Sequence, residues 1–344
     1  MYNLAFKLTK FIIQEFACRR LRLLTKLFIM KTKFELKKML ALFGLIVITV
    51  ATSCKKDKEP MVAEQNIADI VVADNNFSLL KTALVHADLV TTLSGSGPFT
   101  VFAPTNEAFA AAGLDTEEKI NALPKETLRN ILLYHVTGSS IPSASIPVAS
   151  NTAVKSASNI DLFVTKNDRG VYINGATVTK ADVMATNGVI HVINKVLMPP
   201  SGNIVQVAQA NPDFSFLVAA VLRASQGSTN VANVLSGAGP LTVFAPTNAA
   251  FMKAGFTSIA AVQAADPATL TSILTYHVLP GRIFSTDLTE NAMPQTVNGG
   301  KVTITLSGGA KVKGAKNTTP SAITGTDIVT TNGVIHVIDQ VLLP

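Results

Sequence analysis

Three segments of the chain carry apolar residues at helical spacing. Residues 77–93 place Leu79, Leu80, Ala83 and Leu84 on one side of a helix. Residues 118–124 and 125–136 are further helical stretches, and the second leads into a strand. Residues 77–136 are therefore predicted to contain mainly helices.

The strand signals come mostly later. Residues 99–103, FTVFA, form a short apolar run that Pro104 ends, after which Thr105 or Asn106 caps a helix that stops at Gly113. Residues 162–175 predict a hairpin and residues 188–199 a long apolar strand, entered through the turn TNG. Early helices and late strands predict an α+β fold and not a regular βαβ winding.

The same pattern occurs twice. The heptapeptide TVFAPTN stands at 100–106 and again at 242–248, which is 142 positions later. Two further segments recur in the same order, ILLYHV at 131–136 as ILTYHV at 273–278, and TNGVIHVI at 186–193 and at 331–338. A period of this length is the size of a domain. We expect two copies, at 65–200 and 203–344, that fold independently and are joined by the short linker PPSG (199–202).

The basic character of the chain belongs to its beginning. The whole chain has 29 Lys and Arg and 22 Asp and Glu, and residues 1–53 hold ten of these bases and two of these acids. Residues 54–344 therefore hold 19 bases and 20 acids, a net charge of −1. The two copies give no charge argument for binding nucleic acid.

Residues 1–53 are predicted to form a leader. A secretory signal runs from Met30 to Cys54, with a basic start and an apolar run from Met39 to Ala51. That run has about 13 residues and is too short for a membrane span of ~20 residues. We expect translation to start at Met30, the alternative being an unusually long basic region. Residues 54–64 are polar and predict a disordered tether.

The cysteine that ends the signal is a candidate for lipidation. The small residues Ala51, Thr52 and Ser53 before Cys54 resemble a bacterial lipobox, in the looser form found in the Bacteroidetes. Cys54 is the only cysteine after the leader and has no disulfide partner in the chain. The alternative is an ordinary signal peptide followed by a free cysteine. With a lipid on Cys54, the protein is expected in the cell envelope, at an outer membrane, facing the periplasm or the cell surface.

The repeated motifs resemble the fasciclin (FAS1) domain. TVFAPTN followed by AF, a helix that ends in YHV and a final TNGVIHVI strand match its first box, its Tyr-His motif and its second box, twice. The resemblance implies two tandem FAS1 domains, each a β-sheet wedge with helices packed at one side. It also implies adhesion to proteins or cell surfaces. In relatives that bind cells the Tyr-His motif is linked to integrin recognition, which makes Tyr134, His135, Tyr276 and His277 the candidate binding residues.

Each candidate also has a structural interpretation. A Tyr-His pair between apolar residues is more often buried, with its polar atoms hydrogen-bonded. His191 and His336 lie inside VIHVI and are expected in the core, whereas His86 is expected on the surface. Structural roles are also expected for two asparagine pairs. Asn106 and Asn248 should cap helices, and Asn187 and Asn332 should occupy tight turns with positive φ.

The chain has none of the motifs by which common enzymes are recognised. There is no G-x-S-x-G, HExxH, CxxC or Walker loop, and one histidine per box is a poor metal site. We expect no enzyme activity, no cofactor and no metal. The leading hypothesis is a lipid-anchored protein that binds a protein or glycan on a cell surface or matrix. The alternative is a cell-envelope glycan-binding module, although the chain has no Trp to form an aromatic sugar platform.

We predict that the mature protein begins at Cys54 and carries more than one acyl chain, because a single chain binds membranes only weakly. Mass spectrometry of the protein purified from membranes should show acylated Cys54 at the N-terminus. Finding Cys54 as a free thiol in protein released from the membrane fraction would contradict this prediction.

Overall fold

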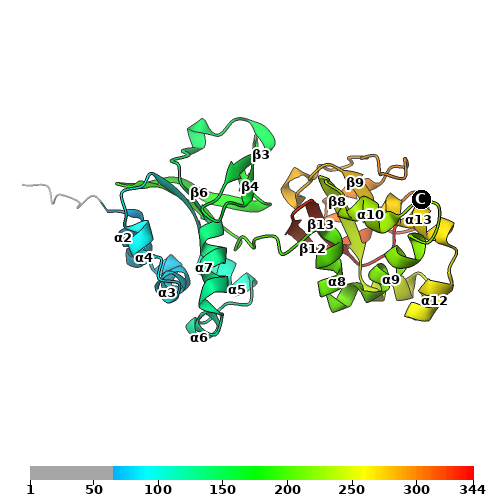
Figure 1. The fold of residues 1–344 in the computed structure, drawn as a ribbon. Helices are drawn as coiled ribbons and strands as arrows, with labels where there is room; N and C mark the ends of the chain where they lie inside the picture. Colours follow the sequence, from blue (N-terminus) through cyan, green and yellow to red (C-terminus); the bar gives the residue numbers. More distant parts are fainter. Residues whose placement is uncertain (1–64) are drawn as a thin grey trace, which may run out of the picture. The chain divides into compact units, whose positions relative to one another are not determined.

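The computed structural model describes residues 65–344. The leader, the expected start at Met30, the lipidation at Cys54 and the tether lie outside the described residues, so these remain predictions. Both copies of the repeat are described in full, each with its own helices and its own sheet. Figure 1 shows the helices α2 to α7 of the first copy on one side of its strands.

In the first copy the helices are α2 (Ile67–Ala73), α3 (Ser78–His86), α4 (Val90–Leu93), α5 (Asn106–Ala111), α6 (Glu117–Asn121) and α7 (Lys125–Tyr134). Its strands are β1 (Phe99–Pro104), β2 (Val136–Thr137), β3 (Ala149–Lys155), β4 (Asp161–Asn167), β5 (Gly170–Ile173), β6 (Ala176–Ala185) and β7 (Gly188–Ile193). They form one seven-stranded sheet in the order β2-β1-β7-β6-β5-β4-β3. The α+β class predicted from the apolar pattern is confirmed.

In the second copy the helices are α8 (Ile204–Ala210), α9 (Ser215–Ala224), α10 (Val231–Ser236), α11 (Asn248–Lys253), α12 (Ile259–Ala264) and α13 (Pro267–Tyr276). Its strands are β8 (Leu241–Pro246), β9 (Val278–Pro280), β10 (Thr303–Thr305), β11 (Lys311–Lys313), β12 (Ser321–Thr330) and β13 (Gly333–Ile338). They form a six-stranded sheet in the order β10-β11-β12-β13-β8-β9.

The two boxes of each copy meet in the middle of its sheet. Strand β1 pairs in parallel with β7, from Phe99 opposite Gly188 to Pro104 opposite Ile193. Strands β8 and β13 pair in the same way. The other strand pairs are antiparallel. Each copy therefore brings its first and last motifs into direct backbone contact.

The central strands are buried on both faces. On β1, Val101 and Ala103 pack against the helices, whereas Phe102 faces a second apolar cluster. The second cluster lies within the curled sheet and receives Tyr134 from the end of α7. The expected covering of VIHVI on both faces is confirmed by the burial of β7 from Val189 to Ile193.

Local signals explain where most helices begin. Asn66 starts α2 with a capping box, because its side chain accepts from the N–H of Asp69 while Asp69 accepts from the N–H of Asn66. Thr105 caps α5. The single helix predicted for 77–93 is wrong in one respect. It is split into α3 and α4 at Asp88, whose φ of 53° leaves the helical region.

The roles predicted for the two asparagine pairs need correction. Thr105, and not Asn106, caps the following helix, whereas the Asn106 side chain reaches back, accepting from Leu79 N–H and donating to Asn75 O. Asn248 makes the equivalent bonds with Phe216 N–H and Pro212 O. Sequence analysis missed this role because it depends on contacts more than twenty residues away.

Asn187 is a buried clamp and not a positive-φ turn residue. Its amide donates to Leu93 O and Gly95 O at 2.7 Å each, and its oxygen accepts from Ile67 N–H at 3.0 Å. Asn332 makes the same three bonds in the second copy. One side chain therefore ties the entry to β7 to the start of α2 and the end of α4. The positive φ, 156°, belongs to the next residue, Gly188, where a Cβ would lie 2.0 Å from Phe99 O.

Replacing Asn187 by alanine should lower the free energy of unfolding of the first copy by about 2–4 kcal/mol, because three hydrogen bonds are lost and their buried backbone partners stay unpaired. Denaturant unfolding followed by circular dichroism measures this loss. The matched control is Asn121→Ala on the exposed end of α6, which should cost about 0.5 kcal/mol or less. Equal stability of the two variants would contradict the stabilising role of the Asn187 hydrogen bonds.

Candidate functional site

Each Tyr-His pair sits where a helix passes into a strand. Tyr134 is the last residue of α7, and His135 ends that helix before β2. Tyr276 and His277 occupy the same places between α13 and β9. All four side chains are buried, with at most 2% of any of them exposed.

The tyrosine hydroxyls are tied to the loops of the strand-rich half. The Tyr134 hydroxyl donates to Asp161 O at 3.0 Å and accepts from the Asn174 amide at 2.8 Å. Tyr276 donates to Lys301 O and accepts from Ala315 N–H. Burial raises the pKa of Tyr134 to about 12. The Tyr134 phenol is therefore a neutral structural group at physiological pH.

The histidine rings bridge two backbone segments. His135 Nδ1 lies 2.8 Å from Ile131 O, and Nε2 accepts from Leu197 N–H at 2.9 Å. His277 has the same partners in its copy, Ile273 O and Leu342 N–H. A carbonyl on one side and an N–H on the other require the neutral tautomer with the proton on Nδ1. Burial lowers the pKa of both histidines to about 4.

The arrangement favours the structural interpretation of the Tyr-His motif. The flanking residues Ile131, Leu132 and Val136 are buried as well, as are Leu274 and Val278. The structure brings each pair together with its helix and the C-terminal loop of its own copy. Direct contact of Tyr134, His135, Tyr276 or His277 with a partner stays a prediction, and their side chains lie below the surface of the described residues.

The second histidine of each copy belongs to a Ser–Asp–His cluster. The carboxylate of Asp182 accepts from the N–H and hydroxyl of Ser143, while the N–H of Asp182 donates to His191 Nδ1 at 3.3 Å. His191 Nε2 lies 2.8 Å from Ile141 O, and the ring stacks on Phe102 with 5.7 Å between ring centroids. The Ser143 hydrogen bonds hold the pKa of Asp182 below its ordinary value.

The second copy repeats this cluster with Ser285, Asp327 and His336. Ser285 donates to Asp327 from its N–H and its hydroxyl at 2.6 Å each, and Asp327 N–H donates to His336 Nδ1. His336 Nε2 lies 2.9 Å from Ile283 O, and burial lowers its pKa. The recurrence of Asp182 as Asp327, 145 positions later, is the sequence signal that could have revealed this cluster.

The cluster lacks the geometry of a nucleophilic triad. In such a triad the histidine accepts the serine proton and its other nitrogen donates to the carboxylate. Here the serine hydroxyl donates to the carboxylate, and both nitrogens of each ring face backbone groups. The three residues therefore fix loops against the central strands.

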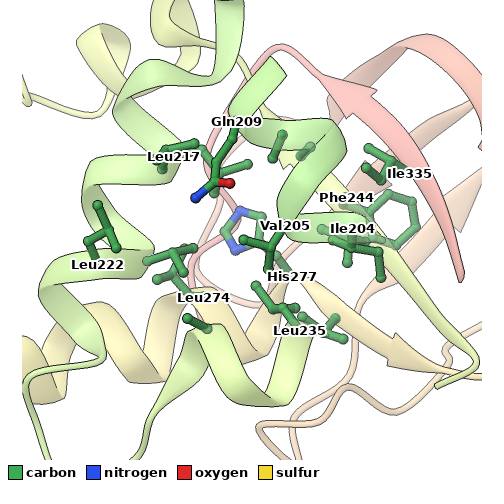
Figure 2. Close-up of a pocket in the computed structure, with 17 residues that line it drawn as sticks. Ile204, Val205, Gln209, Leu217, Leu222, Leu235, Phe244, Leu274, His277 and Ile335 are labelled. Carbon is green, nitrogen blue, oxygen red and sulfur yellow. The ribbon is translucent and has the colours of Figure 1, made fainter. Parts of the chain in front are cut away.

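A cavity of about 80 Å³ lies in the second copy, between the helices α8, α9, α10 and α13 and the strands β8 and β13. Figure 2 shows the His277 ring among the side chains of Gln209, Leu217, Leu274 and Val205. The lining is almost wholly apolar. His277 thus packs against the cavity with its carbon atoms, while its nitrogens are engaged by the backbone.

No three His, Cys, Asp or Glu side chains in residues 65–344 are grouped so as to hold a metal ion. Among the described helices, none combines the length and the apolar character needed to cross a membrane.

The fold and its sites define a class of protein: a tandem pair of α+β domains whose motif residues hold the core together. The Fasciclin domain profile matches this chain twice, at residues 75–199 and 212–344. The chain belongs to the fasciclin (FAS1) family.

Individual relatives agree with this assignment. The chain is 30% identical over 253 residues to the transforming growth factor-beta-induced protein ig-h3 of Sus scrofa, covering 73% of this chain and 35% of that protein. It is 39% identical over 165 residues to protein sll1483 of Synechocystis, covering 46% of this chain and 89% of that protein. This chain therefore spans about a third of the ig-h3 protein.

A solved structure of a FAS1 domain pair from the insect cell adhesion molecule fasciclin I is also similar. It is 21% identical, with a TM-score of 0.39, and the match covers 80% of this chain and 96% of that one.

Replacing His277 by alanine should cost about 2–4 kcal/mol of unfolding free energy at pH 7, because a cavity opens and two backbone groups lose their partner. Denaturant unfolding of the chain measures this. The control is His86→Ala, which removes a half-buried ring bonded to Leu123 O alone and should cost less. Unchanged stability with lost partner binding would make the motif a contact site.

The same variant should show a smaller deficit at pH 4.5 than at pH 7. A folded-state pKa near 4, below the ordinary 6.5, means that the unfolded chain binds the proton first as the pH falls. The stabilisation by neutral His277 is complete above pH 6.5 and is lost between about 6.5 and 4, on the order of 3 kcal/mol in total. Unfolding curves at both pH values measure this difference, and a pH-independent deficit would contradict it.

Proposed function

We infer that this protein is a non-enzymatic adhesion protein of the cell envelope, which binds proteins on a cell surface or matrix through its two FAS1 domains. The observation that carries the inference is the tandem pair itself, matched by the Fasciclin profile over most of the chain. A FAS1 pair of similar extent comes from a protein described as a cell adhesion molecule. The leader and Cys54 supply the secretion signal and lipid anchor in this proposal.

The placement of the histidines within residues 65–344 supports the non-enzymatic part of the proposal. Each of the four buried histidines has both ring nitrogens within hydrogen-bonding distance of backbone groups. A general base must be able to reach the proton that it removes. The remaining histidine, His86, has its Nε2 atom 3.0 Å from the backbone oxygen of Leu123.

The tandem arrangement favours binding to surfaces that carry many copies of a partner. Two linked modules convert a second binding event into an intramolecular one, which raises the effective concentration of the second site. The copies share their buried motifs and differ on their helices, so each can present a different surface. A lipid on Cys54 would hold both copies at the membrane through residues 54–64.

Beads coated with residues 65–344 should adhere to cells or matrix, and protease treatment of those surfaces should abolish adhesion. Counting bound beads before and after treatment measures this. Beads coated with the Asn187→Ala, Asn332→Ala double variant are the control, because both copies lose their clamp and should bind less. Adhesion that survives protease but is lost after periodate oxidation, with saturable binding on a glycan array, would support the glycan-binding alternative and contradict our inference. Chemical conversion of the bound partner would contradict the non-enzymatic part.

A further inference from the structure

The cavity of the second copy is lined in a way that limits what can enter it. Of its 17 lining residues, only Gln209 and His277 have polar side-chain atoms. Both nitrogens of His277 are already engaged, by Ile273 O and by Leu342 N–H. No lining residue is ionised near neutral pH. The interior of the cavity therefore suits an uncharged, apolar group and offers nothing to a sugar, an anion or a metal ion.

The volume of the cavity limits which shapes of ligand can fit inside it. About 80 Å³ is roughly half of the ~150 Å³ of an engineered apolar cavity that binds benzene. A ring does not fit such a space without expansion of the core, whereas the end of an unbranched chain can enter lengthwise. Interiors are close-packed, so a ligand that fills this space gains contacts that the empty cavity lacks.

The mouth of the cavity also accepts a chain that continues outward. Leu222 on α9 belongs to the lining and yet is 55% exposed. Val205 and Val218 are half-buried members of the same lining, and Gln209 is its exposed amide. Figure 2 shows Leu222 on α9 at the edge of the group around His277, and Gln209 on α8 pointing toward that group. Apolar surface thus leads from the solvent into the cavity, with one hydrogen-bonding side chain near the entrance.

At two of the lining positions the first copy carries valine where the second copy carries alanine. Ala208 on α8 corresponds to Val71 on α2, 137 positions earlier, and Ala232 on α10 corresponds to Val90 on α4, 142 positions earlier. Each valine carries two carbon atoms more than alanine. Val205 in place of Ala68 is an opposite change, at the half-buried edge of the lining. The small residues Ala208 and Ala232 therefore help to open space between the helices and the sheet.

We propose that the cavity of the second FAS1 domain binds the end of a single unbranched aliphatic chain, of the kind carried by a fatty acid. The terminal carbons lie among Leu217, Leu235 and Leu274, and the chain leaves past Leu222. The Gln209 amide meets the chain where it becomes polar. This binding site goes beyond the adhesion proposed above, because it takes a small molecule and lies within the second copy.

The test is isothermal titration calorimetry of the full chain with decanoate, below the concentration at which decanoate forms micelles. The filled variant Ala208→Val, Ala232→Val carries the residues of the first copy and should bind decanoate about tenfold more weakly or not at all, since two or more methylene groups lose their place. Every variant keeps residues 1–64, so differences between variants report on the cavity. Benzene should bind more weakly than decanoate. Absent decanoate binding, unchanged binding by the filled variant, or tighter binding of benzene would overturn the proposal.

A second comparison keeps the proposal testable if the filled variant does not fold. Leu222→Ser changes an exposed residue of the mouth and should weaken decanoate binding about threefold. The matched control is Val85→Ser, at the corresponding exposed position of α3 in the first copy, which should leave binding unchanged. Equal affinities of these two variants would place decanoate elsewhere and overturn the proposal.

Discussion

The parallel pairing of the first and last box strands is the contact on which each copy depends. Strands β1 and β7 are separated by more than eighty residues of chain, and their register runs over six residue pairs. Closing so long a loop costs entropy that only extensive burial can offset. The pair is buried on both faces, with the helices on one side and the curled end of the sheet on the other.

The motif residues mainly hold neighbouring segments against this strand pair through hydrogen bonds. Asn187 joins the entry of β7 to α2 and α4, and the carbonyl of His135 accepts from Phe102 N–H on β1. His135 and His191 each link two backbone segments, and burial keeps the His135 ring neutral. A neutral imidazole suits this task because it offers one donor and one acceptor and carries no charge into an apolar interior. Because these motif residues are buried, we assign the proposed adhesion to the outer surfaces of the helices and loops.

The two copies keep the same motif hydrogen bonds but differ in side chains that lie between the helices and the sheet. The bonds of Asn187 and Asn332 correspond one for one, as do those of His135 and His277. The cavity depends instead on Ala208 and Ala232, which lie between helices and outside the repeated boxes. In the proposal above, both copies retain the shared framework while the second also holds a small-molecule site.

Repetition and apolar periodicity in the sequence were enough to predict that the chain has two copies of one domain and that each is α+β. They also predicted the strand at 99–103 and the burial of VIHVI. These features depend on local spacing, which a single sequence displays directly. Tertiary structure alone decided that Asn106 reaches back to α3, that Asn187 is a clamp, that Asp182 holds Ser143 and that a cavity remains beside His277. Each of these depends on which groups, distant in the sequence, lie within about 3 Å of one another in space. That proximity cannot be read from the spacing of residues along the sequence.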